Sequence, residues 1–194
     1  MKMRDASLKP DWDRRYREGF YGEKSGPHGL VRRYSALIAK DKPVIDVAMG
    51  QGSDLLFLAN AGFHACGLER SREAIRIAED AAGREGVKIS CVLGDACALP
   101  FKPGTAGAVL VFYFLEREIM GALAGLLAPG GIIIYETFLK RQNGLDRPRE
   151  PRYLLEDGEL YDSFRGLEPL VYEEGLFVSG TKQRALARYV GRKK

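Results

Sequence analysis

The sequence contains few of the residues on which disulfide frameworks, metal sites and membrane spans depend. Its 194 residues include three cysteines and two histidines, with neither C-x-x-C nor zinc-ligand spacing. We therefore expect no metal site and the reducing conditions of the cytosol. The longest uncharged stretch, residues 119–135, contains Pro129 and two glycines that would interrupt a membrane helix. Residues 1–10 lack an apolar signal core, so we expect a cytoplasmic protein without membrane attachment.

Charge of one sign is also lacking, because 30 basic and 26 acidic residues leave a net charge of only +4. The excess is local, since residues 181–194 carry basic side chains and no acid. A basic segment of this kind can contact RNA, and an RNA-modifying enzyme stays open as an alternative. No N/D-P-P-Y motif of the kind that binds a target base is present, however, so we do not expect nucleic acid as a partner.

Short β-type runs alternate with helical segments along the first two thirds of the chain. The runs are residues 44–49, 65–69, 88–93, 108–114 and 132–138. Apolar residues recur at helical spacing over 74–81, after Ser71 as a candidate N-cap, and over 119–126, before Pro129-Gly130-Gly131. This alternation predicts one α/β domain with a parallel sheet. Residues 139–153 read as a loop, 154–164 as a short helix, and the rest as an antiparallel hairpin turning at Ser179-Gly180.

The most informative segment is PVIDVAMGQGSDL, residues 43–55. A β-branched run ends at Asp46, passes through Gly50 and Gly52, and opens directly into a helical pattern. Glycines let a ligand approach the backbone, and the helix that follows offers unpaired N–H groups. Glu69 ends the next β-type run, 19 residues after Gly50, where a carboxylate can hold the two hydroxyls of a ribose. The segment therefore predicts a nucleotide cradle.

Three features favour S-adenosylmethionine over a dinucleotide, although a dinucleotide oxidoreductase stays open. Leu55 replaces the third glycine of G-x-G-x-x-G. Asp46 precedes the glycines, where it suits a cationic α-amino group better than a pyrophosphate. Gly94-Asp95-Ala96 follows the third run, where the acid can accept a hydrogen bond from an adenine amino group and a backbone N–H can serve a ring nitrogen.

Five motifs in this order resemble the class I S-adenosylmethionine-dependent methyltransferases: VIDVAMGQG, GLERS, GDACALPF, VFYFLER and LLAPGGIIIYET. The resemblance implies a Rossmann-like three-layer sandwich with a seven-stranded, mostly parallel sheet and an antiparallel C-terminal strand. It implies a cofactor site that places Asp46 and Gly50 at the methionine end, Glu69 at the ribose, Asp95 and Ala96 at the adenine, and Phe112 and Tyr113 near the sulfonium; Ala48, Gly52 and Arg70 complete this set. Ala48 and Gly107 depart from the family, which usually has glycine and an acid there.

The sequence offers three candidate catalytic groups but no evident general base. Glu136 closes the fifth β-type run at the expected cleft and is a candidate for positioning the acceptor. His28 lies in the glycine-rich segment SGPHGL, which can fold over the cleft. Tyr113 lies near the end of the fourth run. A soft thiolate or chalcogen acceptor needs little proton chemistry, so the absence of a base favours such an acceptor.

The acceptor pocket is expected between the N-terminal helix and lid segment (1–42) and the loop 139–160. Trp12, Tyr16, Arg149 and Arg152 are the candidate substrate residues, because clustered arginines suit a small anion. WDRRY, YETF and PREPRYLLEDGEL resemble small bacterial methyltransferases of the tellurite-resistance and thiopurine group. That resemblance implies a small-molecule acceptor. A non-catalytic S-adenosylmethionine-binding sensor stays open as well, and the chain is expected to be a monomer or a homodimer.

Overall fold

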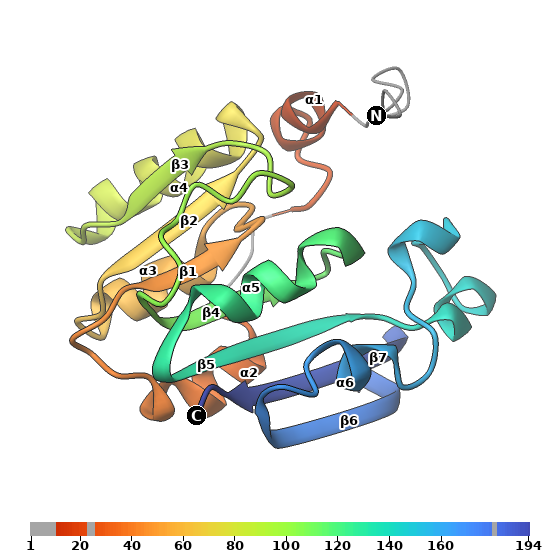
Figure 1. Cartoon of the computed structure of the whole chain (residues 1–194). Coiled ribbons are helices and arrows are strands. Elements are labelled where there is room, and N and C mark those ends of the chain that lie inside the picture. Colours follow the sequence, from red (N-terminus) through yellow and green to blue (C-terminus); the bar gives the residue numbers. More distant parts are fainter. Residues whose placement is uncertain (1–10, 23–25, 180–181) are drawn as a thin grey trace.

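The computed structural model describes residues 11–22, 26–179 and 182–194, and a seven-stranded sheet forms its centre (Figure 1). The strand order is β3-β2-β1-β4-β5-β7-β6. The first five strands are parallel, β7 is antiparallel to β5, and β6 is antiparallel to β7. The strand bounds are β1 Val44–Val47, β2 Ala65–Glu69, β3 Ser90–Leu93, β4 Ala106–Phe112, β5 Leu127–Phe138, β6 Glu168–Ser179 and β7 Lys182–Arg192.

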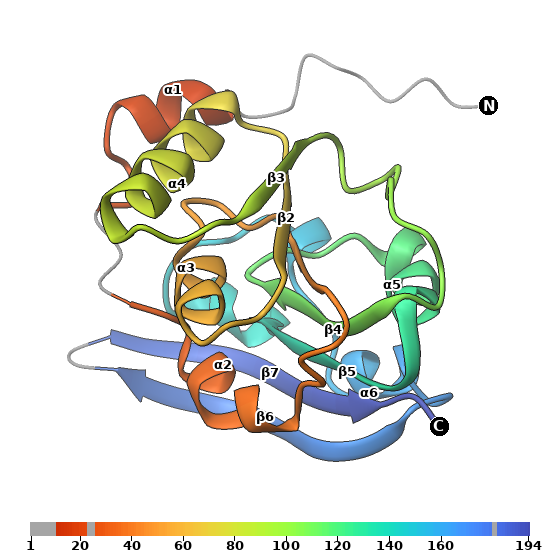
Figure 2. The same cartoon turned by 90° about the vertical axis from the view of Figure 1, so that its left-hand side faces the viewer.

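Helices cover both faces of the sheet and make it a three-layer sandwich. Apolar residues of α2, α3 and α4 pack on one face, and those of α5 and α6 pack on the other (Figures 1 and 2). The helix bounds are α1 Trp12–Arg17, α2 Gly29–Tyr34, α3 Ser53–Asn60, α4 Arg72–Glu85, α5 Met120–Leu126 and α6 Glu159–Ser163. Short 3₁₀ turns occupy Ser35–Leu37, Arg117–Ile119, Lys140–Gly144 and Pro151–Tyr153. The predicted fold class is therefore confirmed.

The sequence pattern explains where the long crossover helix α4 begins and which face it buries. Ser71 caps the helix by accepting a hydrogen bond from the amide of Ala74, as predicted. Ala74, Ala78 and Ala82 recur at helical spacing and are buried against the sheet. Gly86 ends the helix in the left-handed conformation, which glycine adopts without a β-carbon clash. The cap and the small-residue stripe together hold the end of β2 close to the start of α4.

Several predicted boundaries were wrong by a few residues. β3 begins at Ser90 rather than residue 88, and β4 spans 106–112 rather than 108–114. The helix α5 ends at Leu126, and β5 already begins at Leu127, before the Pro-Gly-Gly sequence expected to form the turn. A register irregularity between Ala106 and Ala108 lets β4 follow this stretch. Hydrogen bonding to the neighbouring strands, and not the local sequence pattern alone, sets where these strands begin and end.

The C-terminal hairpin forms as predicted, and Gly180 of the predicted Ser179-Gly180 turn lies outside the described part of the chain. β6 and β7 pair from Glu168↔Arg192 to Ser179↔Lys182. In the described ranges no helix combines the length and apolarity needed to cross a lipid bilayer. The three cysteines are free thiols.

Candidate functional site

The sheet order places the predicted cradle at a topological switch point. From β1 the chain proceeds outward to β2 and β3 on one side, and then returns to β4 and β5 on the other. Ligands of open α/β sheets bind outside the carboxyl ends of the strands at such a point. The glycine turn after β1 lies there, beside the ends of β2 and β4.

Glu69 organises the glycine turn through hydrogen bonds from three backbone amides. Its carboxylate accepts from the amide of Gly50 at 3.0 Å and from the amides of Arg70 and Ser71, both at 2.9 Å. The side chain is buried. The pairing of β1 with β2 places Glu69 beside the glycine turn, because Val47 at the end of β1 lies opposite Leu68, the residue before Glu69. A carboxylate fixed in this way has unused lone pairs for ribose hydroxyls, so it fits the predicted role. The Arg70 side chain itself is exposed.

The turn carries backbone strain at Ala48, whose φ of 60° lies in the left-handed region. Its amide donates to the carbonyl of Leu68 at 2.9 Å, which holds this conformation in place. Gly50 and Gly52 also have positive φ, of 58° and 72°, and there glycine removes the steric cost. Asp46 is buried just before this turn, where its carboxylate can face a ligand's ammonium group. The donor set therefore fits the methionine end of S-adenosylmethionine.

The N-terminal helix α1 covers the glycine turn after β1, residues 48–52, which we call the donor turn. Asp13 of α1 accepts hydrogen bonds from the Ser71 hydroxyl at 2.6 Å and from the Glu73 amide at 3.1 Å. The Tyr16 hydroxyl points to Gly50, and a β-carbon built on Gly50 would meet it at 2.9 Å. Burial and the nearby carboxylates of Glu69 and Asp46 raise the pKa of Tyr16, so it is a neutral phenol that can donate to a ligand.

Asp95 and Ala96 lie after β3, at the far side of the same crevice. The Asp95 carboxylate accepts from the amide of Cys97 at 3.0 Å, and its carbonyl accepts from Ala98 at 2.9 Å. Ala96 is buried at 8% exposure. Gly94 donates to the carbonyl of Glu69 at 2.9 Å, which ties this turn to the ribose-side residue. The predicted adenine contacts therefore lie beside the predicted ribose contact.

A second polar cluster lies at the ends of β4 and β5. The Glu136 carboxylate is 1% exposed and accepts from Nε of Arg188 at 2.6 Å, and its other oxygen lies 3.0 Å from Nε2 of His28. Nδ1 of His28 accepts from the amide of Leu30, so Nε2 carries the proton and donates to Glu136. Burial raises the pKa of Glu136, but hydrogen bonds from His28, Tyr113 and Arg188 outweigh it, and the net pKa is lowered.

Phe112 and Tyr113 connect this cluster to the donor side. The His28 ring stacks on Phe112 with centroids 4.0 Å apart, and the His28 amide donates to Asp54 at the start of α3 at 2.6 Å. Tyr113 has a positive φ of 54°, and its amide donates to the carbonyl of Glu136. Its hydroxyl lies 3.4 Å from Nε2 of His28. The structure thus brings the three predicted catalytic groups together.

A hollow of about 440 Å³ opens beside this cluster. Its walls come from α2 with the His28 cap, from Tyr113 just after β4, and from β5, β6 and β7, and they combine arginines with apolar side chains. The polar and charged lining residues are His28, Arg33, Tyr113, Glu136, Arg184 and Arg188. Because β1, β4 and β5 are neighbours in the sheet, the hollow lies one strand away from the donor turn. That placement suits an acceptor pocket.

The four predicted substrate residues do not line this hollow. Trp12 and Tyr16 belong to α1 over the donor turn, and Arg149 and Arg152 belong to the loop after β5. The Arg152 guanidinium stacks over the neighbouring Tyr153 ring at 4.7 Å. Acceptor binding by these four residues stays a prediction. The arginines that the structure does bring to the hollow come from α2 and β7 instead.

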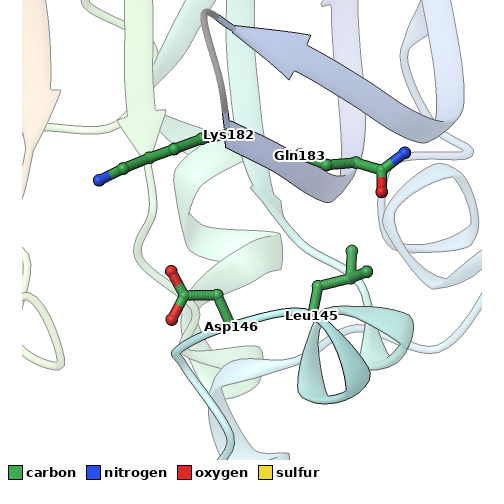
Figure 3. A pocket seen from close by; sticks show the side chains of 4 residues that line it. All are labelled: Leu145, Asp146, Lys182 and Gln183. Atoms are coloured by element: carbon green, nitrogen blue, oxygen red, sulfur yellow. The ribbon is translucent and has the colours of Figure 1, made fainter.

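The loop meets the start of β7 at a second, smaller hollow of about 310 Å³ (Figure 3). Leu145 and Asp146 of the loop face Lys182 and Gln183 across it. Gln142 anchors the loop, since its side-chain oxygen accepts from the amide of Ala185 at 2.9 Å. The loop therefore packs on the β6–β7 hairpin.

Asp13, Arg184 and Arg188 lie at the site but were not among the residues predicted from the sequence. A signal for the two arginines was present, because Arg184, Leu186 and Arg188 alternate along one strand and so share a face. The partner strand was the missing information, since β7 pairs Arg188 with Glu136 across 52 residues. In the part of the chain that the structure describes, no group of three or more His, Cys, Asp or Glu side chains is placed to hold a metal ion.

Comparison with known proteins gives partial matches in sequence. Residues 44–131 match the family described as "Methyltransferase domain". The chain is 27% identical over 162 residues to "Hemagglutinin 1" of Eikenella corrodens, covering 77% of this chain and 53% of that protein. It is 31% identical over 110 residues to "Demethylmenaquinone methyltransferase" of Thermus thermophilus, covering 53% of this chain and 50% of that protein. The chain thus spans about half the length of these curated relatives.

A solved structure gives a broader match of fold. TehB from Haemophilus influenzae superimposes with a TM-score of 0.77 at 18% identity, covering 91% of this chain and 65% of that one. The match covers most of this chain, and at this identity it is a likeness of fold.

Proposed function

We propose, on the premise that this chain belongs to the class I S-adenosylmethionine-dependent methyltransferases, that it transfers a methyl group in line to a small-molecule acceptor. S-adenosylmethionine, with S-adenosylhomocysteine as product, is the donor typical of this family. A soft thiol or chalcogen, or a small anion, is the acceptor class we favour. One observation carries the proposal: Glu69 fixes the glycine turn through three backbone amides while Asp46 lies buried beside it, one strand from a polar hollow.

The residues present would contribute orientation and exclusion of water. The donor turn holds one partner, and the hollow at the ends of β4 and β5 holds the other. Alignment of two bound reactants supplies about 7–11 kcal/mol of the barrier reduction in favourable cases. Glu136 is already paired with Arg188 and His28, so it orients the neighbouring groups rather than acting as a free base. An acceptor that reacts as an anion or thiolate suits this arrangement.

The test is calorimetric titration of the purified chain with S-adenosylmethionine and S-adenosylhomocysteine, followed by a labelled-methyl screen of small acceptors. Glu69→Ala should abolish binding. Because Glu69 also holds the turn, the variant's thermal unfolding must be measured in parallel. Glu85→Ala is the matched control, since Glu85 ends α4 and accepts a hydrogen bond from the exposed side chain of Asn60. Absence of donor binding by the wild-type chain would contradict the proposal.

A non-catalytic donor-binding protein is the second candidate, and Ala48 favours it. A left-handed alanine costs roughly 1–2 kcal/mol, a strain that a glycine would not carry. Tight donor binding without methyl transfer to any thiol, oxyanion, amine or phenol would support this candidate. An RNA-modifying role draws less support, because Arg188 of the basic strand is engaged by Glu136 rather than presented to solvent.

A further inference from the structure

We propose that the acceptor is an organic anion whose apolar body fills the hollow beside Tyr113 and whose anionic head is bound by Arg184 and Arg33. This inference rests on the proposed methyl transfer and names the substrate class of that site. It differs from a bare inorganic oxyanion or a small neutral thiol, which would need neither the volume nor the apolar wall. Size, charge and wall chemistry of the hollow each support it.

The size of the hollow suits an organic molecule. Its volume of about 440 Å³ lies within the range of about 300–1,000 Å³ that is usual for small-molecule pockets. A water molecule takes about 30 Å³, so an oxyanion of a few heavy atoms would fill only a small part of the space. A ring-sized body with a polar substituent would fill much more of it and would exclude water from the reacting atoms.

The charge of the hollow is set by which of its arginines already have partners. Arg188 is paired with Glu136 at 2.6 Å and with Glu173 at 3.6 Å. Among the residues that the structure describes, Arg184 donates to the uncharged hydroxyl of Tyr113 at 3.2 Å and stacks over its ring. Arg33 stacks on Tyr34 with its guanidinium 5.3 Å from the ring centroid.

Across residues 11–22, 26–179 and 182–194, neither Arg33 nor Arg184 forms an ion pair with a carboxylate. Glu136, the one acid in the lining, is already balanced by Arg188. Two guanidinium groups without an anionic partner therefore face the hollow. Guanidinium groups bind carboxylate and phosphate through paired, charge-assisted hydrogen bonds, and their field disfavours a cationic acceptor.

The remaining wall is apolar. Leu30 of α2 and Leu186 of β7 are buried in it, and Phe177 and Val178 come from the end of β6. Val178 is 71% exposed, an unusual state for a valine in a strand and one that a bound apolar body would reduce. The Phe177 ring is held by the Arg188 guanidinium, 3.6 Å from its centroid. An aromatic or aliphatic body can therefore pack on this side while its anionic head meets the arginines.

The reaction balances without a further reactant. The acceptor atom forms a bond to the methyl carbon as the carbon–sulfur bond of the donor breaks, and those electrons stay on the sulfur, which becomes a neutral thioether. If the acceptor begins as a thiol, its proton passes to solvent before transfer. The anionic head is not consumed, so Arg184 and Arg33 bind and orient the substrate and take no part in bond formation.

The test compares three probes that differ in head and body: 2-mercaptobenzoate, benzenethiol without the carboxylate, and inorganic tellurite without the organic body. Affinity is measured by calorimetry on protein loaded with S-adenosylhomocysteine, and methyl transfer is measured with labelled donor. We expect 2-mercaptobenzoate to bind at least about tenfold more tightly than benzenethiol. Arg184→Gln and Arg33→Gln should each weaken the binding of 2-mercaptobenzoate by about tenfold and raise KM more than they lower kcat.

Arg32→Gln is the matched control, because Arg32 belongs to the same helix as Arg33 but does not line the hollow. It should leave the affinity for 2-mercaptobenzoate within about twofold. Equal binding of 2-mercaptobenzoate and benzenethiol, equal losses for both in Arg184→Gln, or faster methylation of tellurite than of 2-mercaptobenzoate would each overturn the inference, as would no binding of either organic probe. Donor titration of the same samples separates these outcomes from failure of the proposed methyl transfer, which would show as absent donor binding.

Discussion

The hydroxyl oxygen of Tyr16 lies over Gly50, 2.9 Å from the position that a β-carbon at Gly50 would occupy. Tyr16 therefore belongs to the donor side of the crevice, next to Glu69 and Asp46, whose charges contribute to its raised pKa. The helix that carries Tyr16 is fastened to the start of α4 through Asp13. We therefore expect α1 to cover a ligand at the glycine turn and to slow its release.

We expect Asp13→Ala to speed the release of S-adenosylhomocysteine by about tenfold or more, because hydrogen bonds to a charged group contribute roughly 1.5–3 kcal/mol. Trp12, the only tryptophan of the chain, stacks with Tyr21 at 6.2 Å and provides a fluorescence signal for stopped-flow measurement. Asp11→Ala is the control, since the Asp11 side chain accepts its hydrogen bond from the Arg14 amide within α1. Equal release rates in wild type and Asp13→Ala would show that α1 does not control release.

The strained turn gives a second prediction. Ala48→Gly should raise the free energy of unfolding by up to about 1 kcal/mol, because relief of the left-handed strain exceeds the added chain entropy of glycine. Chemical denaturation of both proteins measures the difference. Ala59→Gly is a useful contrast, since Ala59 lies inside α3 and glycine there should destabilise by roughly 0.5–1 kcal/mol. A loss of stability in Ala48→Gly would mean that the alanine methyl group contributes packing that outweighs the strain.

The pH dependence of stability follows from the lowered pKa of Glu136. A carboxyl group with a lowered folded-state pKa contributes stability above its ordinary value of 4.5, and this contribution is lost as the pH falls through the folded-state pKa. The free energy of unfolding should therefore fall as the pH is lowered below about 4.5. Glu159 and Asp13, whose pKa values are also lowered, contribute in the same direction.

Glu136→Gln isolates the contribution of Glu136. At neutral pH it should destabilise the fold by about 3–5 kcal/mol, because it leaves Arg188 without its buried partner. Below pH 4.5 the difference from wild type should shrink, since the wild-type carboxyl group is then protonated as well. Glu159→Gln serves as the comparison, and urea unfolding curves across this range measure all three proteins. A difference that stays constant from neutral to acidic pH would contradict the assigned ionisation.

The fold was predictable because its signals are local. The glycine turn and the Ser71 cap each occupy a few neighbouring residues, and each strand or helix of the alternating pattern shows its own local spacing of apolar residues. Strand ends were less predictable, because pairing with a neighbouring strand decides where β3 and β4 begin. Side chains alternate between the two faces of a strand, so Arg184 and Arg188 of β7 share a face. Only the register of β7 with β5 shows that Arg188 lies beside Glu136. The number of arginines in residues 139–160 led us to predict that Arg149 and Arg152 bind the acceptor. The number of charged residues in a segment does not show where their side chains point.

The glycine turn beside Glu69 was likewise predictable from one short segment and its spacing to that residue. The role of Asp13 was not, since its partners Ser71 and Glu73 are 58 and 60 residues away. The sequence also did not show on which side of the crevice Trp12 and Tyr16 lie, and their binding of the acceptor stays a prediction. An aromatic N-terminal segment signals a cover, but the sequence does not show which part of the crevice it covers.

His28 provides the last prediction, because the structure commits both of its ring nitrogens. Nδ1 accepts from the Leu30 amide as the cap of α2, and protonated Nε2 faces Glu136 at 3.0 Å. His28→Asn keeps a strong N-cap residue and should lower kcat for methyl transfer by less than about tenfold. His28→Ala, which loses the cap too, should also reduce the free energy of unfolding by about 1 kcal/mol. Loss of a general base would instead cost about 10²–10⁴-fold in kcat. A loss of that size in His28→Asn, with a changed pH profile and unchanged stability, would establish His28 as a proton acceptor.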